Sequence, residues 1–153
     1  MTTVRPFRAV RPRPELAGKI AAPPYDVLTS DEARERVKDN PISFLRVNKP
    51  EVDFPPDTPA YSKEVYEQGK KNFEALINNG RMVQDNRPSF YLQELIWQGK
   101  SQMGLVALLS LDEYETGIIK RHEQTRPDKV RDRAEHIMTV GAQVGPVMLA
   151  FRT

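Results

Sequence analysis

The fold is decided by the stretch Ser89-Phe-Tyr-Leu-Gln-Glu-Leu-Ile-Trp-Gln-Gly-Lys-Ser-Gln-Met-Gly-Leu-Val-Ala-Leu-Leu-Ser-Leu111. Residues 89–97 alternate in polarity, which is typical of a half-buried strand. Gln98-Gly99-Lys100 predicts a turn, because glycine accepts left-handed backbone geometry. Residues 103–111 are apolar on both faces except for Ser110. The stretch therefore predicts a long β-hairpin over 89–111 whose second strand is central and buried.

Two helices are predicted before this hairpin. The first covers residues 30–38, with Thr29 as the N-cap and Glu32 as its partner in a capping box. The second covers residues 59–79 and is the longest, with Thr58 as the N-cap before a proline. Its apolar positions recur at helical spacing, so they are expected to face the core. These positions are Tyr61, Val65, Phe73, Leu76 and Ile77.

A third helix is predicted over residues 127–140, with Pro127 at its first position and Gly141 at its C-terminal cap. Val130, Ala134, Ile137 and Met138 share one face, which is expected to pack on the core. Lys129, Arg133 and His136 share a different, polar face. Short strands are expected at Val4–Val10, Ile42–Val47, Gly117–Ile119 and Pro146–Phe151. The pattern predicts an α+β fold, with a mixed or antiparallel sheet and about three helices.

Composition excludes several classes of protein. The chain has 153 residues, which fits a single domain over 1–153. It has no cysteine, which removes disulfides and thiolate metal sites. The net charge of +2 is too small to indicate nucleic-acid binding. There is no apolar run of the roughly 20 residues that a membrane span needs, so we expect a cytoplasmic protein without membrane contact.

The candidate functional stretch is Gly117–Arg133, where acids, a histidine, a threonine and several cations lie close in sequence. Glu123 lies among cations, so it is expected to be ionised and able to accept a proton. Phosphate oxygens could be neutralised by nearby cations and by the free N–H groups of the first helical turn. Asp128 or Asp132 could hold Mg²⁺ through water, but no metal site is predicted from the histidine spacing. The cations are Arg121, Arg126, Lys129 and Arg133.

Other interpretations stay open. Charged helix starts are usually solvated faces with i,i+4 pairs, such as Asp132 with His136. Pro23-Pro24 forces an extended backbone before Tyr25 and Asp26. This segment is either a rigid connector whose tyrosine packs on the core, or a support that presents Tyr25 and Asp26 to a ligand.

Five segments carry a resemblance to a bacterial and archaeal family of unknown function, numbered 1015 among such domains. Two of them, Tyr114–Thr125 and Lys129–Arg133, resemble its H-E-x-T…K-x-x-D-R signature. The other three are Val4–Ala9, Ala21–Val27 and Asn40–Leu45, which resemble its opening. Family members are longer and carry a later D-G-H-H-R-like motif. The resemblance therefore implies that the chain is the N-terminal part of a longer protein.

That later motif is similar to one in the ParB/sulfiredoxin-like superfamily, which includes nucleotide-hydrolysing partition proteins and free-serine kinases. The resemblance implies Glu123 as the catalytic base, with His122 as its neighbour in the catalytic pair. It also implies that ATP or ADP with Mg²⁺ would be the cofactor. The residues that it implies on the phosphate side are Arg121, His122, Thr125, Lys129 and Arg133.

Three functional hypotheses follow. The first is a nucleotide-dependent phosphotransferase that acts on a small hydroxyl metabolite. The second is a non-catalytic module that binds a phosphate-bearing ligand or a protein. The third is a structural lobe that self-associates through an apolar C-terminal edge at Val147–Phe151, because an unpaired edge is a template for pairing.

Overall fold

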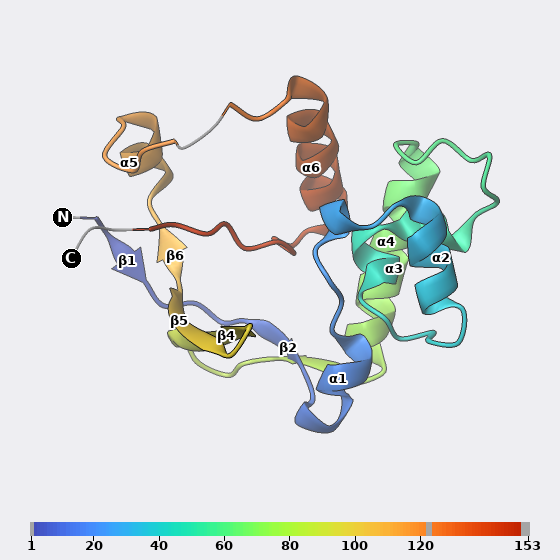
Figure 1. Ribbon diagram of the computed structural model, residues 1–153, viewed down its shortest axis with the longest axis horizontal. Helices are drawn as coiled ribbons and strands as arrows, with labels where there is room; N and C mark the ends of the chain where they lie inside the picture. Colours follow the sequence, from blue (N-terminus) through green and yellow to red (C-terminus); the bar gives the residue numbers. More distant parts are fainter. Residues whose placement is uncertain (1, 122–123, 151–153) are drawn as a thin grey trace. The chain divides into compact units, whose positions relative to one another are not determined.

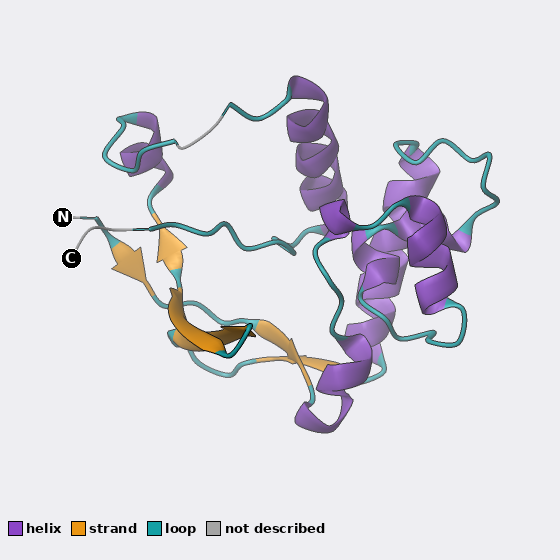
Figure 2. Ribbon diagram, viewed as in Figure 1, coloured by secondary structure: helices purple, strands orange, loops and turns teal. Residues whose placement is uncertain are grey.

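The computed structural model describes residues 2–121 and 124–150 and divides the chain into two compact units. The first, called the strand unit, comprises Met1–Arg11 and Gln84–Thr125. The second, called the helical unit, comprises Pro12–Val83 and Arg126–Thr153. The hairpin belongs to the first unit and the longer helices to the second (Figures 1 and 2). The predicted α+β class is confirmed.

The elements of each unit follow from the backbone hydrogen bonds. The strand unit contains β1 (Val4–Arg5), β4 (Tyr91–Trp97), β5 (Lys100–Val106), β6 (Leu108–Leu109) and α5 (Leu111–Glu115). The helical unit contains α1 (Ala17–Ile20), α2 (Ser30–Val37), α3 (Leu45–Asn48), α4 (Lys63–Asn78) and α6 (Pro127–Val140). It also contains the 3₁₀ helices η1 (Pro14–Leu16), η2 (Tyr25–Val27) and η3 (Pro50–Asp53). The strands β2 (Val10–Pro12) and β3 (Met82–Gln84) form a separate two-stranded sheet.

The predicted hairpin is present. β4 and β5 are antiparallel, with Tyr91 opposite Val106 and Trp97 opposite Lys100. Gln98 and Gly99 form the turn with φ angles of 48° and 73°, the left-handed geometry that matches the twist of a hairpin.

The second strand of the hairpin is neither central nor buried, so that part of the prediction is wrong. Within residues 2–121 and 124–150, β5 pairs with β4 alone. Met103 and Leu105 are 60% and 57% exposed. An apolar run can be read as a central strand, but it cannot specify a partner strand on its far edge.

A polar network joins the N-terminal segment of the strand unit to the hairpin. The Tyr91 hydroxyl donates to Asp85 Oδ2 at 2.5 Å and accepts from the Ala9 N–H at 3.0 Å. Arg11 forms an ion pair with Asp85 at 2.8 Å. The hydrogen bond from Arg11 is the main reason why the pKa of Asp85 lies below its ordinary value. Beyond this network, β1 pairs antiparallel with β6.

In the helical unit, the caps predicted for α2 are confirmed, whereas the predicted start of α4 is wrong. Thr29 and Glu32 form the capping box at the start of α2. The N-cap of α4 is Ser62 rather than Thr58. The N–H groups of Thr58 and Ser62 each close a turn on the residue three positions earlier, so the chain is turning here before the helix begins.

Gly69 on α4 allows a close approach of neighbouring backbone. A Cβ atom at this position would lie 3.2 Å from the Val47 carbonyl oxygen and 3.2 Å from Pro50 Cγ. The helix therefore lies against α3 and η3 at a distance that a side chain would prevent. Val65, Phe73 and Leu76 are buried, as predicted for the apolar face of this helix.

Three predicted short strands are wrong within the described residues. Ile42–Val47 turns into α3, because the Ile42 N–H bonds to Asn40 Oδ1 at 3.3 Å and the Phe44 N–H bonds to the Ile20 carbonyl at 2.8 Å. Residues 117–119 follow α5 as a turn, with Gly117 at φ 77°. Residues 146–150 are extended without strand pairing, and residue 151 lies outside the described part.

The helices are also more numerous than predicted. Among the described residues there are six α-helices rather than about three. The predictions at 30–38, 59–79 and 127–140 correspond to α2, α4 and α6. The other three have only four or five residues each, too short for a periodic pattern to be recognised.

Candidate functional site

The polar face of α6 is the face that packs. The helix begins at Pro127 with Arg126 as the N-cap and ends at Gly141, which has a φ of 75°. Both ends agree with the predictions. The packed side chains are Asp132, His136 and Val140, at 6%, 0% and 6% exposure.

The predicted apolar face of α6 is therefore wrong. Val130 and Met138 are 53% and 80% exposed. Apolar periodicity fails here because Asp132 and His136 form hydrogen bonds within the helical unit, which offsets much of the cost of burying them.

Asp132 is held between two partners. Its Oδ1 accepts a hydrogen bond from the Tyr66 hydroxyl of α4 at 2.9 Å. Its Oδ2 accepts a hydrogen bond from Arg133 Nε at 2.9 Å, and Arg133 Nη2 lies 2.8 Å from the same oxygen as an ion pair. Burial, together with the bond to Asp132, raises the pKa of Tyr66, so the hydroxyl stays protonated and remains a donor.

Arg133 also stacks on Tyr25. Its guanidinium carbon lies 4.1 Å from the centre of the Tyr25 ring. Tyr25 belongs to η2, which follows the extended Pro23-Pro24 segment. The contact stabilises a cation against an aromatic face. Asp26, the next residue, is exposed.

Lys129 lies one helical turn before Arg133 on the same face of α6. Its ammonium donates a hydrogen bond to the Tyr61 hydroxyl at 3.0 Å and lies 5.5 Å from the centre of that ring. This hydrogen bond is the main reason why the pKa of Lys129 lies above its ordinary value. Lys129 is therefore a charged group in a defined position.

His136 fixes the middle of α6 to α3. Its Nε2 donates a hydrogen bond to the Val47 carbonyl at 2.7 Å, so the neutral ring carries its proton on Nε2. Within residues 2–121 and 124–150, Nδ1 has no hydrogen-bond partner. Burial lowers the pKa of His136, so the neutral form is favoured in the fold.

The remaining predicted site residues are distributed as follows. Glu123 and His122 lie outside the described residues. Arg121 is in the strand unit, where its guanidinium lies 4.8 Å from the Tyr114 ring centre. Thr125 is exposed in the same unit. Arg126, at the start of α6, forms an ion pair with Asp128 at 2.7 Å, and this pair is exposed.

Neither Asp128 nor Asp132 has a carboxylate oxygen without a hydrogen bond. Both oxygens of Asp128 accept from Arg126, and both oxygens of Asp132 accept from Tyr66 and Arg133. Mg²⁺ is usually held by one or two carboxylates with several waters, and here it would have to compete with these hydrogen bonds. Across the described residues, no group of three acidic or histidine side chains could hold a metal. These residues do not fit the Mg²⁺ that the resemblance implies.

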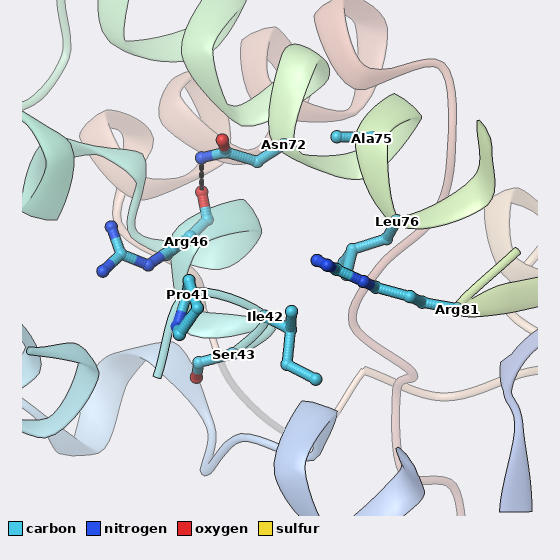
Figure 3. Close-up of a pocket in the computed structure, with 8 residues that line it drawn as sticks. All are labelled: Pro41, Ile42, Ser43, Arg46, Asn72, Ala75, Leu76 and Arg81. Carbon is cyan, nitrogen blue, oxygen red and sulfur yellow. Dashed lines mark hydrogen bonds between the residues drawn. The ribbon is translucent and has the colours of Figure 1, made fainter. Parts of the chain in front are cut away.

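A small pocket lies elsewhere in the helical unit (Figure 3). Its volume is about 50 Å³, room for one or two water molecules. The Asn72 amide that faces it donates to the Arg46 carbonyl at 2.7 Å, and Arg46 itself pairs with Asp53. Its lining residues are Pro41, Ile42, Ser43, Arg46, Asn72, Ala75, Leu76 and Arg81. The pocket contains none of the predicted site residues, and most of its polar groups have partners within the fold.

Sequence reasoning missed three contributors to the arrangement around α6. Tyr61 was expected in the core of the longest helix, but it is 60% exposed and contacts Lys129. Tyr66 was not considered, and Asp132 was expected on the surface. The usable signal was the spacing of Asp132 and His136, which places two polar groups on one helical face.

Three comparisons with known proteins bear on the identity of the chain. A search of curated proteins and a search of solved structures both returned no match. Among the described residues, no helix combines the length and apolar character needed to cross a membrane. A family model described as "Protein of unknown function (DUF1015)" matches residues 4–153. The chain therefore belongs to the DUF1015 family, as its opening segments and its H-E-x-T…K-x-x-D-R signature predicted.

Proposed function

We propose that the chain binds a phosphate-bearing small molecule at Lys129 and Arg133, and that it supplies the phosphate side of a nucleotide-dependent phosphotransferase. The observation that carries this proposal is the positioning of both cations. Each is in contact with a tyrosine from another segment, Tyr61 or Tyr25. A cation held in place before the ligand arrives loses less side-chain entropy on binding.

In the transfer reaction, Glu123 would take the proton of a substrate hydroxyl. The hydroxyl oxygen would form a bond to the terminal phosphorus of ATP while the bond to the bridging oxygen breaks, and ADP would leave. Lys129 and Arg133 would neutralise the charge on the phosphate oxygens, which is the main requirement of phosphoryl transfer. Arg121, His122, Thr125 and Arg126 are proposed as further phosphate-binding residues from the signature segment.

Calorimetric titration with ATP, ADP and inorganic pyrophosphate tests the binding step. We expect Arg133→Ala to weaken binding at least about tenfold, because a hydrogen bond to a charged group contributes about 1.5–3 kcal/mol. Lys129→Ala should weaken it less, and added salt should weaken binding to the wild type. Arg131→Ala is the matched control, since Arg131 is an exposed arginine of the same helix. Equal losses of affinity in Arg131→Ala and Arg133→Ala would refute a defined phosphate site.

Glu123→Gln separates a phosphotransferase from a binding module. We expect it to abolish transfer from ATP to a panel of small hydroxyl metabolites while leaving nucleotide affinity within about twofold. Wild-type protein that binds ATP but transfers no phosphate to any member of the panel would favour the non-catalytic phosphate-binding module.

A further inference from the structure

The side chains behind Arg133 form a chain of contacts that begins on α4. The Tyr66 hydroxyl donates to one oxygen of Asp132, and Arg133 Nε donates to the other, which also lies 2.8 Å from Nη2. Tyr66 and Asp132 are each only 6% exposed. In this position they support Arg133 and are not themselves available to a ligand.

The contacts define which edge of the guanidinium is occupied. Asp132 takes the edge formed by Nε and Nη2. The Tyr25 ring lies on one flat face, 4.1 Å from the guanidinium carbon. Within residues 2–121 and 124–150, no hydrogen bond is found from Nη1 of Arg133. The Arg133 side chain is 25% exposed, and its outer edge is formed by Nη1 and the second N–H of Nη2.

That outer edge presents two parallel N–H groups. Their geometry matches two oxygens of one phosphate or carboxylate group. Lys129 lies one turn away on the same face and adds a second positive charge. Two cations favour a doubly charged phosphate over a singly charged carboxylate.

We infer that Tyr66 and Asp132 are positioning residues that hold Arg133 for a two-point contact with a terminal phosphate, an inference that rests on the proposed phosphate site. Asp132 fixes the rotation of the guanidinium, and Tyr66 fixes the rotation of the Asp132 carboxylate. The ligand class is a dianionic phosphate, as at the end of a nucleoside di- or triphosphate.

Titration with inorganic pyrophosphate tests the inference. Tyr66→Phe removes one hydroxyl and should lower affinity about threefold to tenfold. Asp132→Asn should lower it more than tenfold, because the charged partner of Arg133 is lost. Arg133→Lys should bind pyrophosphate no better than Arg133→Ala, since an ammonium cannot pair with Asp132 and donate to two phosphate oxygens at the same time. Acetate, a singly charged carboxylate, should bind at least tenfold more weakly than pyrophosphate.

A second measurement separates positioning from a general loss of structure. The Arg133 Nε–H signal in a ¹⁵N NMR spectrum should exchange slowly with water in the wild type and in Arg131→Ala. It should exchange faster in Tyr66→Phe at a temperature where that variant remains folded.

The outcomes distinguish the two proposals. Wild-type protein that does not bind pyrophosphate removes the proposed phosphate site and the inference with it. Wild-type binding that Arg133→Ala abolishes, but that folded Tyr66→Phe and Asp132→Asn retain at full strength, overturns the positioning inference alone. If Asp132→Asn does not fold, the affinity of Tyr66→Phe for pyrophosphate still tests the positioning inference.

Discussion

His136 is fully enclosed within the helical unit, at 0% exposure, which makes its protonation state part of the fold. Burial is the largest cause that lowers its pKa. The bond to the Val47 carbonyl raises the pKa, Arg133 lowers it, and Asp132 and Glu51 raise it. A proton added to Nδ1 would find no acceptor among the described residues. The folded protein therefore favours the neutral ring.

This residue predicts a dependence of stability on pH. The folded pKa of His136 is lowered, so below the ordinary value of 6.5 the unfolded chain binds a proton more readily than the folded chain. The free energy of unfolding should be constant above about pH 7 and fall as the pH drops below 6.5, by at most about 1.4 kcal/mol per pH unit. Urea unfolding of the wild type between about pH 5 and about pH 8, on either side of the ordinary histidine pKa of about 6.5, measures this fall.

Two variants test whether His136 causes this fall in the free energy of unfolding. His136→Gln keeps an N–H group that can donate to the Val47 carbonyl, but glutamine does not titrate. The fall in the free energy of unfolding between about pH 7 and about pH 5 should therefore disappear. His122→Gln changes the other histidine and should leave the fall intact. The account of His136 is wrong if His136→Gln retains the same slope as the wild type.

At the scale of elements, the packing of α4 depends on the absence of a side chain at Gly69. Alanine would bring a Cβ atom within 3.2 Å of the Val47 carbonyl oxygen and of Pro50. The backbone oxygen cannot move without disturbing its bond to His136. Overpacking of this kind costs about 1–3 kcal/mol, which outweighs the gain of about 1 kcal/mol in helix propensity.

We therefore expect Gly69→Ala to lower the free energy of unfolding by up to about 2 kcal/mol. Gly18→Ala in α1 is the control, because a Cβ atom there would meet no atom within 4 Å. It should leave stability unchanged or raise it by up to about 1 kcal/mol. Thermal or urea unfolding of both variants measures the difference, and equal effects would contradict the close approach at Gly69.

In α2 and α6, local signals in the sequence predicted the ends correctly, whereas the packed face of α6 was not predicted. The capping box at Thr29, the proline at 127 and the glycine at 141 each act within one helical turn, so a single sequence reveals them. The packed face of α6 depends on Tyr66 and on the Val47 carbonyl, which are distant in sequence. Apolar periodicity cannot detect such polar partners, and it selected the exposed face instead.

At the scale of the whole molecule, the chain divides into a strand unit and a helical unit. The sequence predicted the α+β class because the hairpin and the three longer helices each carry a clear period. It did not predict the short helices α1, α3 and α5, whose geometry comes from turns and local hydrogen bonds. The family followed from segments spread along the chain, and the matched region spans residues 4–153.

The candidate site was predicted only in part, for a related reason. The signature segment contains Lys129 and Arg133, but the residues that hold them come from other parts of the helical unit. Tyr25, Tyr61 and Tyr66 precede the segment by many residues, and no short motif connects them to it. The roles of Glu123 and His122 remain proposals.

The most direct test of the account is a ¹H–¹⁵N NMR titration of the protein with inorganic pyrophosphate, following arginine side-chain signals. The account predicts that the Arg133 signals shift in a saturable manner while the Arg131 signals stay in place. Arg133 signals that do not move, or Arg131 signals that move equally, would contradict a phosphate site on the packed face of α6.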